Sequence, residues 1–302
     1  MNRIKNVARL ILASTLIAML ASCGGSSDSR FSYSDFIVFG ASLSDTGNVY
    51  TASNGSTPGS SPNYYLGRWS NGPLWIDNVA NSYGKDVKAS LLGGTDYAYG
   101  GAQTCAISGV TSTVPDMCDQ INQYLLSVSN KANPNALYVI DASAVGNEIT
   151  KVLSGTVATT QITTIAPTNV TNMLQSLYAA GARRFLVANV PDVGSTPLVQ
   201  GYGATAAANA TSLSGGFNIA LDSALNNFAI TNPSAVVYKA DLYGTLAKIK
   251  TTPSNYGISN ITDACQINGN ICTNPVNYLY WDSFHPTNTI GNIISSYVLG
   301  FI

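Results

Sequence analysis

Charge is what this 302-residue sequence has least of. Only 10% of its residues are Asp, Glu, Lys or Arg, against roughly 25% in an average soluble domain. The surface must therefore be built largely from neutral polar side chains. The sequence also lacks a basic cluster and a phosphate-binding glycine loop. We therefore expect no nucleic-acid partner and no nucleotide ligand.

Histidine is scarcer still, because His285 is the only one in the chain. A lone histidine excludes a multi-histidine metal site, and no cysteine pair has the spacing of a zinc site. We therefore expect no metal and no cofactor.

The N-terminal residues differ in composition from the rest. Three basic residues precede an apolar run at residues 10–20, which is too short to cross a membrane as a stable helix. Cys23 follows in the string LASCGG, which resembles a bacterial lipoprotein signal. We interpret residues 1–22 as a lipoprotein signal peptide, Cys23 as the lipidation site and residues 23–34 as a flexible tether. The alternative is a plain secretory signal cut near Ala21 or Ser22, in which Cys23 has no role.

Both interpretations imply export, either as an outer-membrane lipoprotein held by its lipid anchor or as a secreted periplasmic or extracellular protein. Apart from Cys23, four cysteines remain, and an even number in an oxidising compartment favours two disulfides. Pairing Cys105 with Cys118 and Cys265 with Cys272 is the simplest of three possible connectivities.

Strand and helix patterns alternate along the rest of the chain. Apolar runs predict strands, and apolar residues at helical spacing predict helices. The predicted strands are residues 36–39, 136–141, 184–189 and 235–238. The predicted helices lie near 74–82, 170–178 and 217–228, and Gly181 is expected to end the second of them. This alternation favours an α/β fold, a three-layer α/β/α sandwich around a central parallel sheet. No second linker is visible, so we expect a single domain at residues 35–302.

The stretch FIVFGASLSDTGN at residues 36–48 ends a predicted strand at Gly40 and places Ser42 in a Ser/Asp/Gly-rich segment. We expect a strand-to-helix turn here, with backbone N–H groups of the helix start beside the Ser42 hydroxyl. The alternative is an ordinary loop or N-cap serine. In a parallel sheet, Ser42, the Gly100-Gly101 loop and the segments after the strands at 136–141 and 184–189 would open on one edge.

The C-terminal string YWDSFHPT places Asp282 three residues before His285. On a turn, both side chains can face one pocket, where the carboxylate fixes the tautomer of the imidazole. The alternative is a structural histidine with an acid nearby.

Taken together, GASLSDTGN, the Gly-Gly loop and WDxxHPT resemble the GDSL (SGNH-type) esterase and lipase family. The strings YYLGRWSNGPLWID and LYAAGARRFLVANVPDVGSTP are similar to its lipase-like branch, which includes secreted bacterial phospholipase/acyltransferases and thermolabile haemolysins. The resemblance implies a flavodoxin-like SGNH-hydrolase domain and a serine esterase or lipase that forms an acyl-Ser42 intermediate. It implies an ester substrate, with lipid or phospholipid acyl esters favoured.

The resemblance also assigns roles to individual residues. Ser42 matches the nucleophile, His285 the general base and then acid, and Asp282 the third triad member. The oxyanion hole would comprise the backbone N–H groups of Ser42 and Gly101 and the side-chain amide of Asn147. A loop Asn that caps a helix is the alternative for Asn147.

Two departures from the family pattern leave other functions open. Ala41 replaces the Asp of the GDSL motif, and Glu148 replaces the usual Asp in a block about two residues longer than usual. These departures make a catalytically weak surface-binding lipoprotein one alternative. A carbohydrate acetylesterase of the same fold is another, which the low charge and the many polar residues do not exclude. Arg68 is a candidate phosphate ligand or half of a structural ion pair. The oligomeric state is not predicted.

Overall fold

The computed structural model describes residues 31–59 and 62–302, and Ser32–Ile302 form one compact unit. The predicted signal peptide at residues 1–22, the predicted lipidation site Cys23 and most of the predicted tether lie outside the described residues. Within the described part of the chain, no helix is long and apolar enough to cross a membrane.

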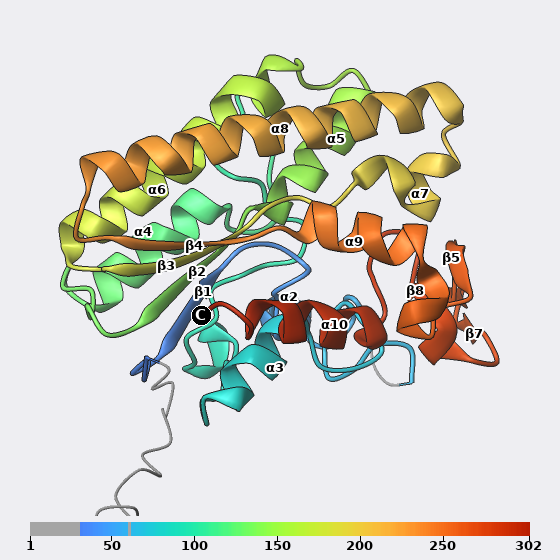
Figure 1. The fold of residues 1–302 in the computed structure, drawn as a ribbon, viewed down its shortest axis with the longest axis horizontal. Helices are drawn as coiled ribbons and strands as arrows, with labels where there is room; N and C mark the ends of the chain where they lie inside the picture. Colours follow the sequence, from blue (N-terminus) through green and yellow to red (C-terminus); the bar gives the residue numbers. More distant parts are fainter. Residues whose placement is uncertain (1–30, 60–61) are drawn as a thin grey trace, which may run out of the picture. The chain divides into compact units, whose positions relative to one another are not determined.

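Four parallel strands form the central sheet, in the spatial order β1-β2-β3-β4 (Figure 1). They are β1 (Phe36–Phe39), β2 (Leu137–Asp141), β3 (Arg184–Ala188) and β4 (Val236–Ala240). Their register is continuous, since Phe36 pairs with Leu137 and Leu137 pairs with Arg184. Each predicted strand is present within two residues of its expected ends, and the predicted parallel sheet is confirmed. The carboxyl ends of all four strands therefore open on one edge.

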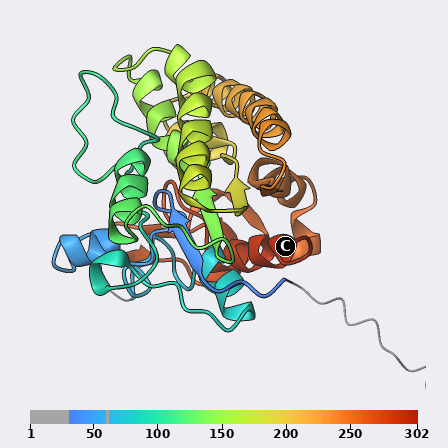
Figure 2. The same cartoon turned by 90° about the vertical axis from the view of Figure 1, so that its left-hand side faces the viewer.

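Helices cover both faces of this sheet, as Figures 1 and 2 show. On one face lie α4 (Met117–Ser127), α5 (Val145–Leu153), α6 (Ala166–Ala180) and α8 (Ala204–Thr231). On the other face lie α3 (Trp75–Ser82) and α10 (Asn288–Val298). Strands β1 and β2 are buried on both faces, which explains why they read as apolar runs instead of alternating patterns, whereas β4 is only partly buried.

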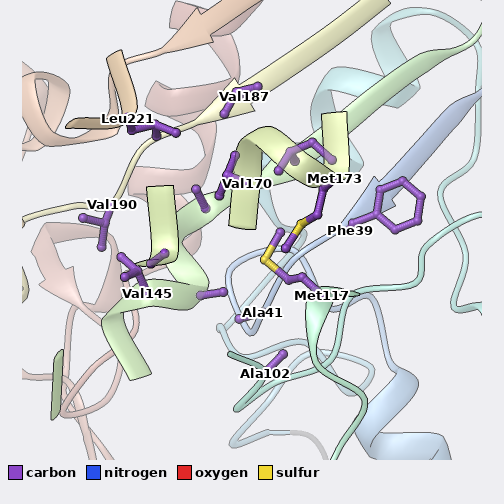
Figure 3. Close-up of a cluster of buried hydrophobic side chains, with 14 of the residues drawn as sticks. Phe39, Ala41, Ala102, Met117, Val145, Val170, Met173, Val187, Val190 and Leu221 are labelled. Carbon is purple, nitrogen blue, oxygen red and sulfur yellow. The ribbon is translucent and has the colours of Figure 1, made fainter. Parts of the chain in front are cut away.

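The largest apolar cluster lies between the sheet and the first of these helix layers. Alternate strand residues such as Phe39 and Ile140 meet Met117 of α4, and Val170 and Met173 of α6. Figure 3 shows several of these side chains gathered around the strand ends. Helix α6 ends at Gly181, whose φ of 122° lies in the region that favours glycine, as the sequence predicted. Because the cluster includes Ala41 and Val145 as well, the core extends to the segments that carry the predicted site.

The remaining elements surround the carboxyl edge of the sheet. They are α2 (Asn48–Ala52), α7 (Pro197–Gln200), α9 (Leu242–Thr251), a parallel pair β5 (Asn260–Ala264) and β8 (Tyr278–Tyr280), and the hairpin β6 (Gln266–Ile267) with β7 (Asn270–Ile271). Disulfides join Cys105 to Cys118 and Cys265 to Cys272, which is the local pairing that the sequence favoured. The second disulfide closes the β6–β7 hairpin. The sequence analysis did not predict this hairpin.

Candidate active site

Ser42 lies in a tight turn directly after β1. The backbone N–H groups of Ser44 and Asp45 both donate to the Ala41 carbonyl oxygen, at 3.1 and 3.0 Å. The turn leaves Ser42 only 6% exposed. Helix α2 begins only at Asn48, so the expected helix start directly after Ser42 is not found. The N–H groups beside Ser42 belong to this turn instead.

The Asp45 carboxylate explains why the helix begins only at Asn48, and it connects two loops of the site. Its Oδ1 accepts from the N–H groups of Gly47 and Asn48 at 2.9 and 2.6 Å, and its Oδ2 accepts from the Gly100 N–H at 2.8 Å. Such side-chain bonds to the backbone compete with helix formation. Burial raises the pKa of Asp45, and the backbone N–H donors oppose that rise. Asp45 thus holds the Ser42 turn against the Gly100-Gly101 loop.

The Gly100-Gly101 loop needs glycine at both positions for different reasons. Gly101 has a φ of 86°, which favours glycine. A Cβ at Gly100 would overlap the Trp69 indole. The Gly100 N–H is occupied by Asp45, whereas the Gly101 N–H has no partner among the described residues. The Gly101 N–H is therefore the donor of this pair that a ligand can use.

Asn147 lies in the first turn of α5, close to that loop. Its Nδ2 donates to the Ala102 carbonyl oxygen at 2.8 Å. A side-chain amide carries two N–H groups, so this bond fixes the amide and leaves a second donor. Asn147 lines the same pocket as Ser42. The structure therefore brings Ser42, the Gly101 loop and Asn147 to one edge of the sheet.

Glu148, which departs from the family pattern, is fully buried beside them. Its Oε1 accepts from the Thr104 N–H and hydroxyl at 2.6 and 2.7 Å, and its Oε2 accepts from Gln161 Nε2 at 2.9 Å. Burial raises the pKa of Glu148, and these hydrogen bonds oppose the rise. The longer carboxylic side chain thus joins α5 to the residues that follow the glycine loop.

Asp282 and His285 face each other across a turn between β8 and α10, in which the Trp281 N–H donates to the His285 carbonyl oxygen at 2.7 Å. His285 Nδ1 lies 2.9 and 2.8 Å from the two Asp282 carboxylate oxygens. The backbone N–H groups of Phe284 and His285 donate to Oδ1, at 2.8 Å each. Burial by itself would raise the pKa of Asp282, but the charge and hydrogen bonds of His285 outweigh burial and bring this pKa to about 2.

One pocket joins the two halves of the predicted site. Ser42 and Asn147 line it together with Phe284 and Pro286, which flank His285, and its volume is about 40 Å³. The rest of the lining is mostly apolar and includes Leu43, Val190, Pro191, Val193, Leu246, Tyr280 and Ile294. Within the described residues the Ser42 hydroxyl has no hydrogen-bond partner, so the contact with His285 is open. Such contacts often close only in the complex with substrate.

Besides Asp45, the sequence analysis missed two further buried carboxylates that hold the Ser42 turn. Asp141 Oδ2 accepts from the Ser44 hydroxyl at 2.8 Å, and Asp96 Oδ2 accepts from the Thr46 N–H and hydroxyl at 2.7 and 2.6 Å. The place of Asp141 at the end of a predicted strand could have indicated it. Across residues 31–59 and 62–302, no group of three or more His, Cys, Asp or Glu could hold a metal ion.

Two contacts of the loop before α3 complete the surroundings of the site, of which the first was not predicted and the second was one of the two alternatives for Arg68. The Tyr64 hydroxyl donates to Asp282 Oδ2 at 2.8 Å, and the two residues are 218 positions apart in the sequence. Arg68 forms a double hydrogen bond with Asp77, at 2.9 and 3.2 Å, so its guanidinium is half of a structural ion pair.

A buried serine turn at a strand end, an Asp–His pair and an apolar pocket between them are groups that suit the cleavage of carboxylic esters. The chain belongs to the GDSL-like lipase/acylhydrolase family, whose sequence model matches residues 36–298, and it is a carboxylic ester hydrolase. The resemblance inferred from the sequence motifs is thereby confirmed.

Individual relatives agree with this membership. The chain is 27% identical over 258 residues to phosphatidylcholine-sterol acyltransferase of Aeromonas hydrophila, covering 83% of this chain and 70% of that protein. It is 28% identical over 315 residues to a GDSL esterase/lipase of Arabidopsis thaliana, covering 86% of each. It is 32% identical over 189 residues to Lipase 1 of Photorhabdus luminescens, covering 61% of this chain and 26% of that protein.

Proposed function

We propose that the protein is a serine esterase or lipase that hydrolyses carboxylic esters through an acyl-Ser42 intermediate, with lipid or phospholipid acyl esters as favoured substrates. The observation that carries this proposal is the 2.8 Å contact between His285 Nδ1 and Asp282, beside the pocket that Ser42 and Asn147 line. A nucleophile, a base oriented by a carboxylate, and donors for an oxyanion are the groups that acyl transfer requires.

In the first half-reaction, His285 Nε2 takes the Ser42 hydroxyl proton while Ser42 Oγ bonds to the ester carbonyl carbon. The carbonyl oxygen becomes an oxyanion, which accepts hydrogen bonds from the N–H groups of Ser42 and Gly101 and from Asn147 Nδ2. The C–O bond to the alcohol then breaks, and His285 gives its proton to the leaving oxygen. The acyl group remains on Ser42.

The second half-reaction repeats these steps with water. His285 takes a proton from the water, the water oxygen attacks the acyl carbon, and the carboxylic acid leaves as Ser42 regains its proton from His285. Asp282 stabilises the protonated imidazole throughout, and its pKa of about 2 keeps it ionised at neutral pH. An alcohol in place of water would give acyl transfer, a variant supported by similarity to an acyltransferase.

The apolar pocket supports an acyl chain over an acetyl group. An acetyl ester would leave side chains such as Val193, Leu246 and Ile294 without a partner, whereas a longer acyl chain buries apolar surface against them. Arg68 donates to the Asp77 carboxylate and to the Leu66 carbonyl oxygen, which favours the structural ion pair over a phosphate ligand for this residue.

Turnover of p-nitrophenyl acetate, butyrate and octanoate by the wild type and Ser42→Ala tests the proposal. We expect Ser42→Ala to lower turnover by on the order of 10^4 or more, and to abolish labelling by a fluorophosphonate. Butyrate or octanoate should exceed acetate. Activity confined to acetate would favour the carbohydrate acetylesterase instead. A folded wild type that neither turns over esters nor accepts the label would favour the surface-binding lipoprotein.

We also infer export with lipid attachment at Cys23. The motif around Cys23 supports it, and the two disulfides agree with folding in an oxidising compartment. Cells that express the wild type should incorporate a palmitate analogue into the protein, and Cys23→Ser should not. Equal incorporation in both would contradict lipidation at this residue, and secretion of unlabelled wild type would favour the plain secretory signal.

A further inference from the structure

The carboxylate of Asp282 has a partner outside its own turn. Its Oδ1 accepts from the backbone N–H groups of Phe284 and His285, which belong to the same five-residue turn. Its Oδ2 accepts from the Tyr64 hydroxyl at 2.8 Å and lies equally close to His285 Nδ1. Tyr64 and His285 therefore share one oxygen of the carboxylate.

The loop that carries Tyr64 holds the same turn at three further points. The Asn63 carbonyl oxygen accepts from Trp281 Nε1 at 2.8 Å. The Ser70 hydroxyl donates to the Pro286 carbonyl oxygen at 2.9 Å. The Trp69 indole lies against the His285 ring, with centroids 5.0 Å apart. Contacts on both sides of Asp282 and His285 fix where the Tyr64 hydroxyl lies.

We propose that Tyr64 is a positioning residue for the reaction, which acts by holding Asp282 Oδ2 and by sharing that oxygen with His285. The inference rests on the proposed function, since it assumes that Asp282 and His285 serve Ser42. The Tyr64 hydroxyl keeps the carboxylate from rotating away from Nδ1. It also draws negative charge from Oδ2 that would otherwise stabilise the imidazolium.

The titratable groups around Asp282 and His285 determine how the loss of the Tyr64 hydroxyl acts. Asp282 contacts the imidazole of His285, and the Tyr64 hydroxyl donates to Asp282. Asp192 lines the same pocket and is paired with Lys250 at 3.8 Å. The Tyr280 hydroxyl is bonded to Ser195. Of these groups, only Asp282 accepts a hydrogen bond from the Tyr64 hydroxyl, so the test below is designed around Asp282 and His285.

The test is Tyr64→Phe, which keeps the aromatic ring beside Trp69 and removes only the hydroxyl. With p-nitrophenyl butyrate we expect kcat to fall about tenfold, because a hydrogen bond to a charged group is lost, while KM stays within about twofold of the wild type. The acidic limb of the kcat/KM–pH profile should move to higher pH, because the carboxylate then stabilises the imidazolium more strongly. The matched control is Tyr65→Phe, whose ring lies over Arg68 and which should behave as the wild type.

A double-variant comparison separates positioning from a general structural role. If Tyr64 acts through Asp282, then Tyr64→Phe should cost less than about twofold in an Asp282→Asn background. The same tenfold loss in both backgrounds, or a Tyr64→Phe enzyme with the kcat and pH profile of the wild type, overturns the inference.

The lone histidine allows a readout that does not need turnover. Proton NMR of the full chain can observe the Nδ1–H of His285 without overlap from another imidazole. In Tyr64→Phe this resonance should move downfield, because Oδ2 has lost a competing donor. If no Ser42-dependent turnover exists, the proposed function fails by itself and this measurement decides the inference. An unchanged resonance then overturns it.

Discussion

The two halves of the candidate site hold their carboxylates in opposite ways. Around Ser42, the side chains of Asp45, Asp96 and Asp141 are fully buried and accept hydrogen bonds from N–H and O–H groups. Burial raises the pKa of all three, and for Asp96 the nearby charge of Asp45 raises it further. Asp282 is almost as buried, yet its pKa is lowered to about 2.

The difference shows what a neighbouring charge adds to hydrogen bonds. Asp45 accepts from several backbone N–H groups, and these neutral dipoles do not offset the loss of hydration. Asp282 has hydrogen bonds of the same kind and, in addition, the imidazole of His285. The first half of the site is thus a scaffold that fixes loops, whereas the second half keeps an ionised group ready to stabilise a cation.

The halves also differ in what positions them. The Ser42 turn and Asn147 follow directly from the ends of adjacent parallel strands, so the register of the sheet sets their separation. The Asp282–His285 turn lies outside the central sheet, between β8 and α10. Contacts from the loop at residues 63–70 hold it in place.

The strongest test of this division is the removal of the base. We expect His285→Ala to lower kcat/KM for p-nitrophenyl butyrate by on the order of 10^4 or more, since neither proton transfer has another acceptor. The double variant Ser42→Ala/His285→Ala should lose little more than either single variant, because the two residues act as one unit. Fully additive losses would show that they do not.

On the other half, Asn147→Ala should lower kcat by on the order of 10^2 to 10^3 by removing one oxyanion donor. The effect should fall on kcat and not on KM, because the donor is needed most when charge develops. Asn226→Ala, an exposed position on α8, is the matched control. A neutral Asn147→Ala would assign the third donor to another group.

The contrast in pKa predicts how acid affects stability. Ordinary Asp has a pKa of about 3.9, so the lowered pKa of Asp282 stabilises the native state by about 2 kcal/mol above pH 4. That contribution should be lost as the pH falls from about 4 through about 2. Denaturant unfolding of the wild type and Asp282→Asn should show their difference in free energy shrink over this window. A constant difference would contradict the low pKa.

The buried carboxylates of the Ser42 half change stability with pH in the opposite direction to Asp282. Their raised pKa values mean that protonation favours the folded state, so their contribution to stability increases as the pH falls from neutral. They are present in both proteins of the preceding comparison, and the difference between the two unfolding curves therefore isolates Asp282.

The smallest effect concerns the wall between the pocket and a second cavity. A second cavity of about 20 Å³ adjoins the pocket, and the two share Leu43, Pro286 and Ile294. Ile294→Ala should join them and extend the preferred acyl chain by about two carbons, measured with p-nitrophenyl esters of increasing length. Ile290 lies one turn earlier on α10 and lines neither cavity, so Ile290→Ala is the control. An unchanged chain-length profile would place the acyl chain elsewhere.

Local patterns were enough to predict the elements that bring the site together. Apolar runs located the four strands, Gly181 marked the end of α6, and the three-residue spacing of Asp282 and His285 predicted their hydrogen bond. The two disulfides matched the simplest local pairing. In each case the partners are close in sequence, or the feature depends on one residue's own conformational preference.

Other features depended on segments far apart in the chain. The helix after Ser42 starts late because Asp45 bonds the backbone N–H groups that a helix would use, and the same carboxylate reaches the Gly100 N–H. Tyr64 meets Asp282 across 218 residues. A sequence records which side chains can donate or accept, and at short range it also records their spacing. At long range only the packing of the folded chain decides which donor reaches which acceptor. The chain has several tyrosines and aspartates, and the sequence alone does not favour one pairing of them over another.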